Sequence, residues 1–155
     1  MNQEKCRECI ALLEESIPIV KKMGLKVLDF ADGYAKLMLP LEKNVNHIGI
    51  IYAGSLFTLG EMAGGAVFHA AFDNKRFYPI VKDVAIQFKR MATNDVTLEV
   101  QIGREAAEKI STRAEKEGKA DYSLNLEIKD LKGEICCLVT GTWQLRKNPS
   151  AEPLK

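Results

Sequence analysis

Glu61 is the only acid or strong base in an apolar stretch of the chain that runs from His47 to Phe72. An ionised carboxylate in such surroundings is costly to desolvate unless hydrogen-bond donors hold it. Burial also raises its pKa toward the range in which carboxylates act as acids and bases. The sequence therefore predicts a chemical role for Glu61, either as a general base or as a nucleophile.

The residues around Glu61 predict a long helix that other structure surrounds. Between Ser55 and Phe72, apolar residues cover nearly every side of a helix, which is typical of a wrapped helix. Gly60, Gly64 and Gly65 each lower helix stability by up to about 1 kcal/mol relative to alanine, so they predict that another backbone comes very close. A sheet curled around the helix would supply that contact.

The same stretch is long enough to cross a bilayer, and basic residues flank it at Lys43, Lys75 and Arg76. Its glycines, its histidines and Glu61 are atypical of a membrane span, and the rest of the chain has the pattern of a globular domain. We therefore expect no membrane partner.

Length and composition predict one globular domain. The chain has 155 residues, of which 46% are hydrophobic and 28% charged, with a net charge of +1. No basic face interleaved with aromatic residues is present, so we expect no nucleic-acid partner. The N-terminus is charged where a secretory signal needs an apolar core, which predicts a cytoplasmic protein. We expect the domain to span residues 1–147 and the polar, proline-containing residues 148–155 to form a disordered tail.

The cysteines and histidines give no sign of a metal site. Cys6 and Cys9 have redox or zinc spacing, but no second pair of ligands accompanies them, and they lie on a predicted helix. Cys136 and Cys137 lie on a predicted strand and point to opposite faces of it. We expect neither a metal nor a disulfide framework, and no bound cofactor.

The hydrophobic periodicity predicts an α+β domain. The order is helix, two strands, long buried helix, two strands, surface helix, two strands. Val84, Ile86 and Phe88 alternate with more polar residues, which predicts a strand with one buried face. The predicted elements outside the long helix are helices at 2–13 and 104–118 and strands at 25–30, 34–39, 78–90, 96–102, 122–128 and 134–145.

With these elements the chain resembles the hotdog-fold thioesterases, in particular the phenylacetate-pathway-type acyl-CoA thioesterases and a related branch whose substrates are undefined. That family has an Asn, five residues, then His-Gly-Gly at the start of the central helix, and an acid nine positions after the His. Asn46, Tyr52-Ala53-Gly54 and Glu61 fall at these spacings here. Tyr52 replaces the family's His and Ala53 its first Gly, as in the related branch. The resemblance covers residues 1–147 and implies a curved antiparallel sheet wrapped around a long central helix.

The resemblance implies hydrolysis of an acyl-CoA or acyl-carrier thioester, with Glu61 in the position of the catalytic carboxylate. If the helix begins near Ala53, the N–H of Gly54 becomes an oxyanion donor, aided by the helix dipole. Asn46 either holds the lytic water or the carbonyl through its amide, or only caps its loop. The sole cofactor-like molecule implied is coenzyme A as part of the substrate.

Further residues are candidates for substrate contact. The Tyr52 hydroxyl can replace the family's imidazole, and Ser55 and Thr58 either touch substrate or, in our preferred interpretation, bond the helix backbone. His69 is expected to be a packed helix residue. The full set of substrate-binding candidates is Tyr52, His47, Ser55, Thr58, Lys89 and Arg90, of which the last two would hold the phosphates of coenzyme A or form a solvated strand end.

Two other functions share the implied fold. One is a non-catalytic, acyl-thioester-binding dimer, and the other is a hydratase or dehydratase of acyl thioesters, which lacks a well-placed His here. We also expect a homodimer or a dimer of dimers, because a curled sheet leaves an exposed edge. The resemblance implies that the helix mouth of one subunit faces the Asn-bearing loop of the other, so that Asn46 and Glu61 of one site come from different chains.

Overall fold

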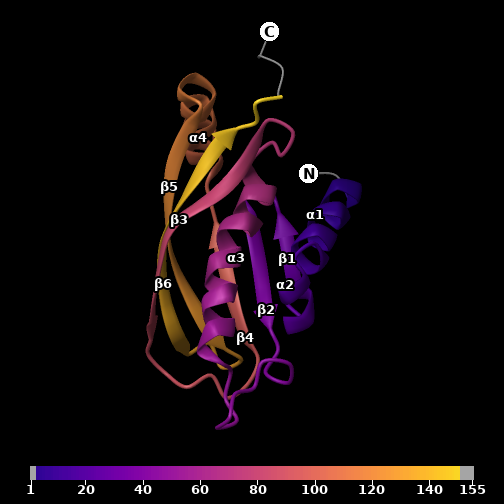
Figure 1. Ribbon diagram of the computed structural model, residues 1–155, viewed down its shortest axis with the longest axis vertical. Coiled ribbons are helices and arrows are strands. Elements are labelled where there is room, and N and C mark those ends of the chain that lie inside the picture. The colour runs from indigo at the N-terminus through magenta and orange to yellow at the C-terminus, as the bar shows by residue number, and fades with distance from the viewer. Residues whose placement is uncertain (1–2, 151–155) are drawn as a thin grey trace.

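The computed structural model describes residues 3–150, which form four helices and one six-stranded sheet (Figure 1). The helices are α1 (Gln3–Glu15), α2 (Pro18–Met23), α3 (Ala53–Ala71) and α4 (Arg104–Glu117). The strands are β1 (Lys26–Ala31), β2 (Tyr34–Leu39), β3 (Phe77–Phe88), β4 (Val96–Gln101), β5 (Lys119–Asp130) and β6 (Ile135–Lys147). Their order in the sheet is β1-β2-β4-β5-β6-β3, and every neighbouring pair is antiparallel.

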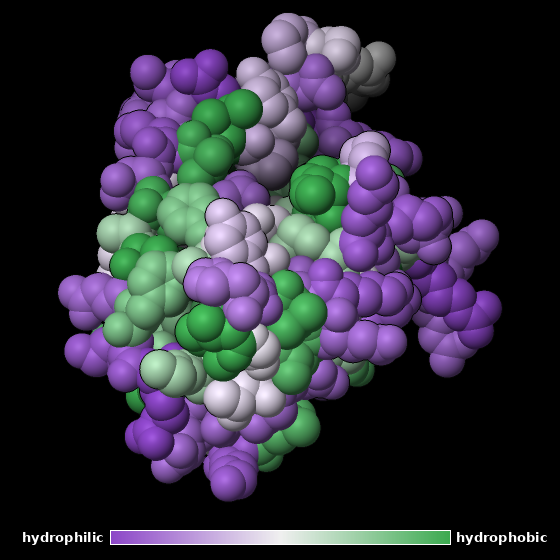
Figure 2. Space-filling view, turned by 60° about the horizontal axis from the view of Figure 1, so that its bottom comes forward, coloured by the Kyte–Doolittle hydropathy of each residue, from purple (hydrophilic) through white to green (hydrophobic). Residues whose placement is uncertain are grey.

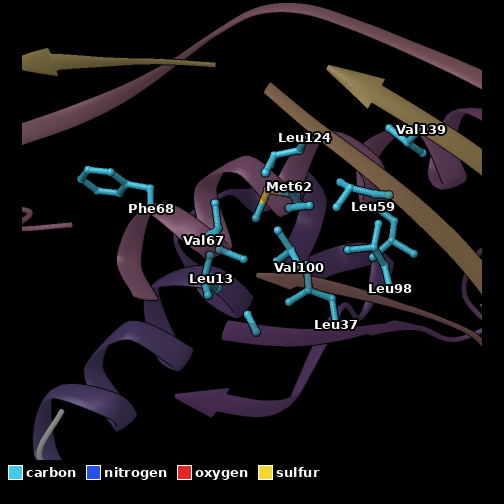
Figure 3. Packing of buried hydrophobic residues seen from close by; sticks show 14 of the residues in the cluster. Leu13, Leu37, Leu59, Met62, Val67, Phe68, Leu98, Val100, Leu124 and Val139 are labelled. Atoms are coloured by element: carbon cyan, nitrogen blue, oxygen red, sulfur yellow. The ribbon is translucent and has the colours of Figure 1, made fainter. Parts of the chain in front are cut away.

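The sheet curves around α3, while α1 and α2 lie beside β1 (Figure 1). Leu59, Met62 and Val67 of α3 are buried against Leu37 of β2 and Leu98 of β4, and they form the centre of the core (Figure 3). The α+β class and the curved antiparallel sheet are thus confirmed. None of the helices in the described part of the chain combines the length and apolarity that a membrane crossing needs.

Two of the helix glycines do meet the sheet, although through side chains and not through a second backbone. A Cβ atom on Gly60 would lie 3.0 Å from the Val139 methyl groups, and one on Gly64 would overlap the indole ring of Trp143. Both partners are on β6. A Cβ atom on Gly65 would have no other atom within 4 Å.

These adjacent glycines predict opposite effects on stability. Gly64→Ala should lower the free energy of unfolding by about 1 to 3 kcal/mol, because the buried Trp143 ring has no room to move away. Gly65→Ala should raise it by up to about 1 kcal/mol through helix propensity, because its Cβ enters open space. Chemical denaturation of both variants, followed by tryptophan fluorescence, gives the two differences. A destabilised Gly65→Ala would contradict the open space at that position.

Strand β3 departs from the sequence expectation of one buried face. Val84 and Ile86 are only partly buried, and Phe88 is 52% exposed. The reason is topological, because β3 pairs only with β6 and forms one edge of the sheet. The alternating pattern identifies a strand, but it cannot show that this strand has no second neighbour among residues 3–150.

Two other segments differ from the predicted organisation. The short helix α2 was not predicted, although Pro18 in its first turn and Gly24 at its C-terminal cap are start and stop signals. Of the expected tail, residues 148–150 are described, and the backbone N–H of Asn148 donates to the Arg76 carbonyl at 2.7 Å. Residues 151–155 of that tail lie outside the described part.

Candidate active site

Glu61 lies in the third turn of α3 and is half-buried. It borders a cavity of about 210 Å³ between α1, α3, β3 and β6, which we call the Glu61 hollow. Burial raises the pKa of the Glu61 carboxyl above its ordinary value. No described residue donates a hydrogen bond to this carboxylate or forms an ion pair with it. The apolar residues of the wall are Leu12, Leu13, Ile17, Met62, Pro79, Val81 and Trp143.

Glu61 belongs to one incompletely covered face of α3. Thr58, Glu61, Gly65 and His69 recur at helical spacing and are only partly buried, whereas the intervening residues from Met62 to Gly64 are buried. The expectation of a helix wrapped on every side was therefore wrong for this face. This face borders the Glu61 hollow.

The helix begins at Ala53, as expected, and Tyr52 is its N-cap residue without a side-chain cap bond. The N–H groups of Ser55 and Leu56 donate to the Tyr52 carbonyl at 3.0 and 3.1 Å. Those of Ala53 and Gly54 have no backbone acceptor in the described part of the chain, so they remain available to a developing oxyanion. The Tyr52 ring is largely exposed and lies against Gly54 on the side where a Cβ atom would stand.

Asn46 caps its own loop through its carbonyl oxygen. Oδ1 accepts hydrogen bonds from the N–H groups of Ile48 and Ile50 at 3.0 and 3.3 Å, which confirms the loop-capping interpretation for this atom. The amide nitrogen Nδ2 has no acceptor among the described residues and keeps two donors for a ligand. Asn46 therefore has both a structural bond and an unused donor.

A second cavity of about 330 Å³ lies at the start of α3, and we call it the helix-mouth hollow. Asn46, Ala53, Lys89 and Arg90 all line it, so the structure brings the loop asparagine, the helix start and the two cations together. Arg90 Nη1 pairs with Glu134 Oε2 at 2.8 Å, while no described acid pairs with Lys89. Within one chain, Asn46 and Glu61 border different hollows.

The other candidates differ in what surrounds them. The Thr58 hydroxyl donates to the Gly54 carbonyl at 2.9 Å, which confirms its helix-backbone role. Ser55 is buried in the first turn, and within the described part its side chain makes no hydrogen bond. His47 is exposed in its loop and borders neither the Glu61 hollow nor the helix-mouth hollow.

On α3, sequence reasoning missed two residues of the Glu61 hollow. Gly65 and His69 line it, one and two turns after Glu61. His69 had been expected to be a packed helix residue, but it is partly exposed, and burial lowers the pKa of its imidazole. The signal that identifies both is their spacing of four and eight residues from Glu61 on one helical face.

The solved structures that share this curved antiparallel sheet and helix include thioesterases of the hotdog fold. The chain belongs to the YiiD_C family, described as "Putative thioesterase (yiiD_Cterm)", which matches residues 6–147. No curated protein matches the chain.

Three solved structures illustrate the similarity. A protein of unknown function from Pseudomonas aeruginosa, described as a probable thioesterase, is 41% identical; the match covers 92% of this chain and 95% of that one, with a TM-score of 0.87. A thioesterase-like protein from Shewanella oneidensis is 18% identical over 92% and 98% of the two chains, with a TM-score of 0.74. A thioesterase from Haemophilus influenzae is 13% identical over 94% of both chains, with a TM-score of 0.70. The last two show the fold alone.

Proposed function

We propose that the chain is an acyl-CoA or acyl-carrier thioesterase in which Glu61 is the catalytic carboxylate. The observation that carries this proposal is a half-buried carboxylate, without a donor among the described residues, in the wall of an apolar hollow. A structural carboxylate would have hydrogen-bond partners to offset its burial. Membership of a thioesterase family supports the same reaction.

The reaction needs a nucleophile and a site for negative charge on the carbonyl oxygen. Glu61 would either take a proton from the attacking water or attack the thioester carbonyl itself. The N–H groups of Ala53 and Gly54 would stabilise the oxyanion, because they point out of the helix start, where the helix dipole is positive. Asn46 Nδ2 would donate to the same oxygen or hold the water.

Distances along α3 support an arrangement in which these two parts come from different chains. Gly54 and Glu61 are seven residues apart, or about 10 Å along the helix axis, and the N–H of Gly54 points away from Glu61. An oxygen bound at Gly54 is therefore out of reach of Glu61 in the same chain, even through one water. The site is complete when the helix-mouth hollow of one chain faces the Glu61 hollow of its partner.

The free edge of β3 is the surface through which we propose that two copies pair. Pro79 and Val81 of this strand line the Glu61 hollow, and Phe88 and Lys89 at its end line the helix-mouth hollow, so β3 connects the two half-sites. The end of the molecule around the helix mouth also exposes apolar residues among polar ones (Figure 2). Asn46 lies beside the helix mouth of its own chain, whereas the resemblance implied a position opposite the partner's helix mouth. In the proposed arrangement the residue facing Asn46 across the interface is the partner's Glu61.

Coenzyme A phosphates would bind at the helix-mouth hollow. Lys89 is the better candidate of the two cations, since Arg90 already pairs with Glu134. This placement leaves the nucleotide near the surface and sends the acyl group toward the partner's Glu61.

The experiment that tests this function is incubation of the purified protein with acyl-CoAs from two to sixteen carbons and with phenylacetyl-CoA. Free coenzyme A is separated and measured by chromatography, because thiol reagents would also react with the protein's own cysteines. Release that depends on Glu61 supports the proposal. Binding of these thioesters without release would instead identify a non-catalytic binding protein.

The pH dependence of the reaction follows from the raised pKa of Glu61. Only the deprotonated carboxylate acts as a base or a nucleophile, so kcat/KM should fall tenfold per pH unit below the pKa of the free enzyme. Because burial raises that pKa, the fall should begin at a higher pH than an exposed glutamate would give. A pH profile of kcat/KM measures this, and a rate that stays flat down to the ordinary pKa of glutamate would contradict it.

A further inference from the structure

The Glu61 hollow continues beyond the carboxylate along α3. Gly65 and His69 follow Glu61 at intervals of four residues, so all three border the hollow on one helical face. Gly65 offers no side chain there, and a Cβ atom built on it meets nothing within 4 Å. An open path therefore runs from Glu61 over Gly65 toward His69, with α1 on one side and β3 on the other.

Leu12 and His69 form the far end of this path. Both residues also line a third cavity, which has a volume of about 850 Å³ and lies between α1 and the end of α3. We call it the outer groove. They thus separate the Glu61 hollow from the outer groove. Leu12 is 43% exposed, so little of the core depends on it.

We infer that this path is the acyl pocket, that Gly65 keeps it open and that Leu12 with His69 sets the length of the chain it accepts. The inference rests on the proposed function and names its substrate class as straight, uncharged acyl chains of short to medium length. Apolar side chains of α1, β3 and β6 line most of the path, which suits methylene groups and not a charged chain end. Burial lowers the pKa of the His69 imidazole and so disfavours a cation at the end wall, where a distal carboxylate would need one.

The rise of the helix gives an estimate of the acyl length that the path can hold. At about 1.5 Å per residue, Glu61 and His69 are about 12 Å apart along the axis, which an extended chain of about ten carbons spans. Gly65 is about 6 Å from Glu61, a length that about five carbons span. A large side chain at position 65 should therefore leave room for a butyryl group and exclude most of an octanoyl group.

The test compares Gly65→Leu with the matched variant Gly65→Ala. In Gly65→Leu, kcat/KM for octanoyl-CoA should fall about 100-fold, because three to four methylenes lose their place and each contributes about fourfold to binding. The value for butyryl-CoA should fall far less, and circular dichroism shows independently whether the variant is folded. Gly65→Ala adds only one methyl group to the path, so its loss for octanoyl-CoA should be much smaller than that of Gly65→Leu, and the control variant Glu117→Gln on the surface of α4 should retain the wild-type profile for both substrates.

Leu12→Ala provides the reciprocal change. It removes the exposed part of the end wall and joins the hollow to the outer groove, so the preferred chain should lengthen beyond about ten carbons. An unaltered length profile in both Gly65→Leu and Leu12→Ala would overturn the acyl-pocket assignment.

Calorimetric binding of S-butyl-CoA and S-octyl-CoA thioethers separates this inference from the proposed function. Selective loss of S-octyl-CoA binding in Gly65→Leu supports the pocket even if no thioester is hydrolysed, in which case only the proposed function fails. Hydrolysis by the wild type with equal thioether binding in all variants would overturn the pocket alone.

Discussion

Glu61→Gln should reduce kcat for acyl-CoA hydrolysis by about 100- to 10,000-fold while the protein remains folded. Glutamine has the size of glutamate and keeps the hollow filled, but it can neither accept the proton of a water nor form an acyl intermediate. Steady-state kinetics at neutral pH measure the loss. A variant that keeps near-normal turnover would show that another group performs the chemistry.

The stability of the same variant provides an independent readout. The folded protein holds the Glu61 proton more tightly than the unfolded chain, because burial raises the pKa of this carboxyl. The wild type should therefore lose stability as the pH rises from the ordinary pKa of glutamate through the raised one, and Glu61→Gln should lack that loss. Glu117→Gln on the surface of α4 is the matched control, which should alter neither turnover nor this pH dependence.

Mixing two inactive variants should restore about a quarter of the wild-type activity. Asn46→Asp keeps the side-chain oxygen that caps the loop but removes the amide donor, and Glu61→Gln removes the carboxylate. After joint denaturation and refolding, about half of the dimers are mixed, and each mixed dimer has one site with an intact helix mouth and an intact Glu61.

Two differently tagged variants allow the mixed dimers to be isolated and counted. Absence of activity in verified mixed dimers would mean that each site lies within one chain. Full activity of Asn46→Asp alone would remove Asn46 from the site and leave its loop bonds as its only role.

The sequence was sufficient for the parts of the site that depend on local pattern. The helix from Ser55 onward and the isolated acid at position 61 follow from spacing and hydropathy over neighbouring residues, and the resemblance to the family motif implied the start near Ala53. The Glu61 hollow does not, because its walls come from segments as far apart as Leu12 and Trp143. Periodicity assigns each of these side chains to a helix or a strand, but only the packing of α1 and β3 on α3 creates a cavity between them.

The prediction of a close neighbour was correct for Gly64 and wrong for Gly65, for the same reason. A glycine in a helix signals a close neighbour on average, and Gly64 has one in Trp143. Gly65 is the adjacent residue in the sequence and points 100° away around the helix, toward open space. Which glycine serves packing and which serves a cavity depends on the rotation of α3 relative to the sheet, and no local pattern records that rotation.

The free edge of β3 also bears on how the chain avoids aggregation. A strand of twelve residues with one unpaired edge is a template for uncontrolled pairing with other chains. Pro79 donates no backbone hydrogen bond, the register shifts between Val81 and Asp83, and Lys82 places a charge at that irregularity. Only the segment after Asp83 therefore has a regular edge. A partner strand can form regular backbone hydrogen bonds with this short segment but not along the whole of β3. Protection against aggregation and selection of one register are thus encoded in the same few residues.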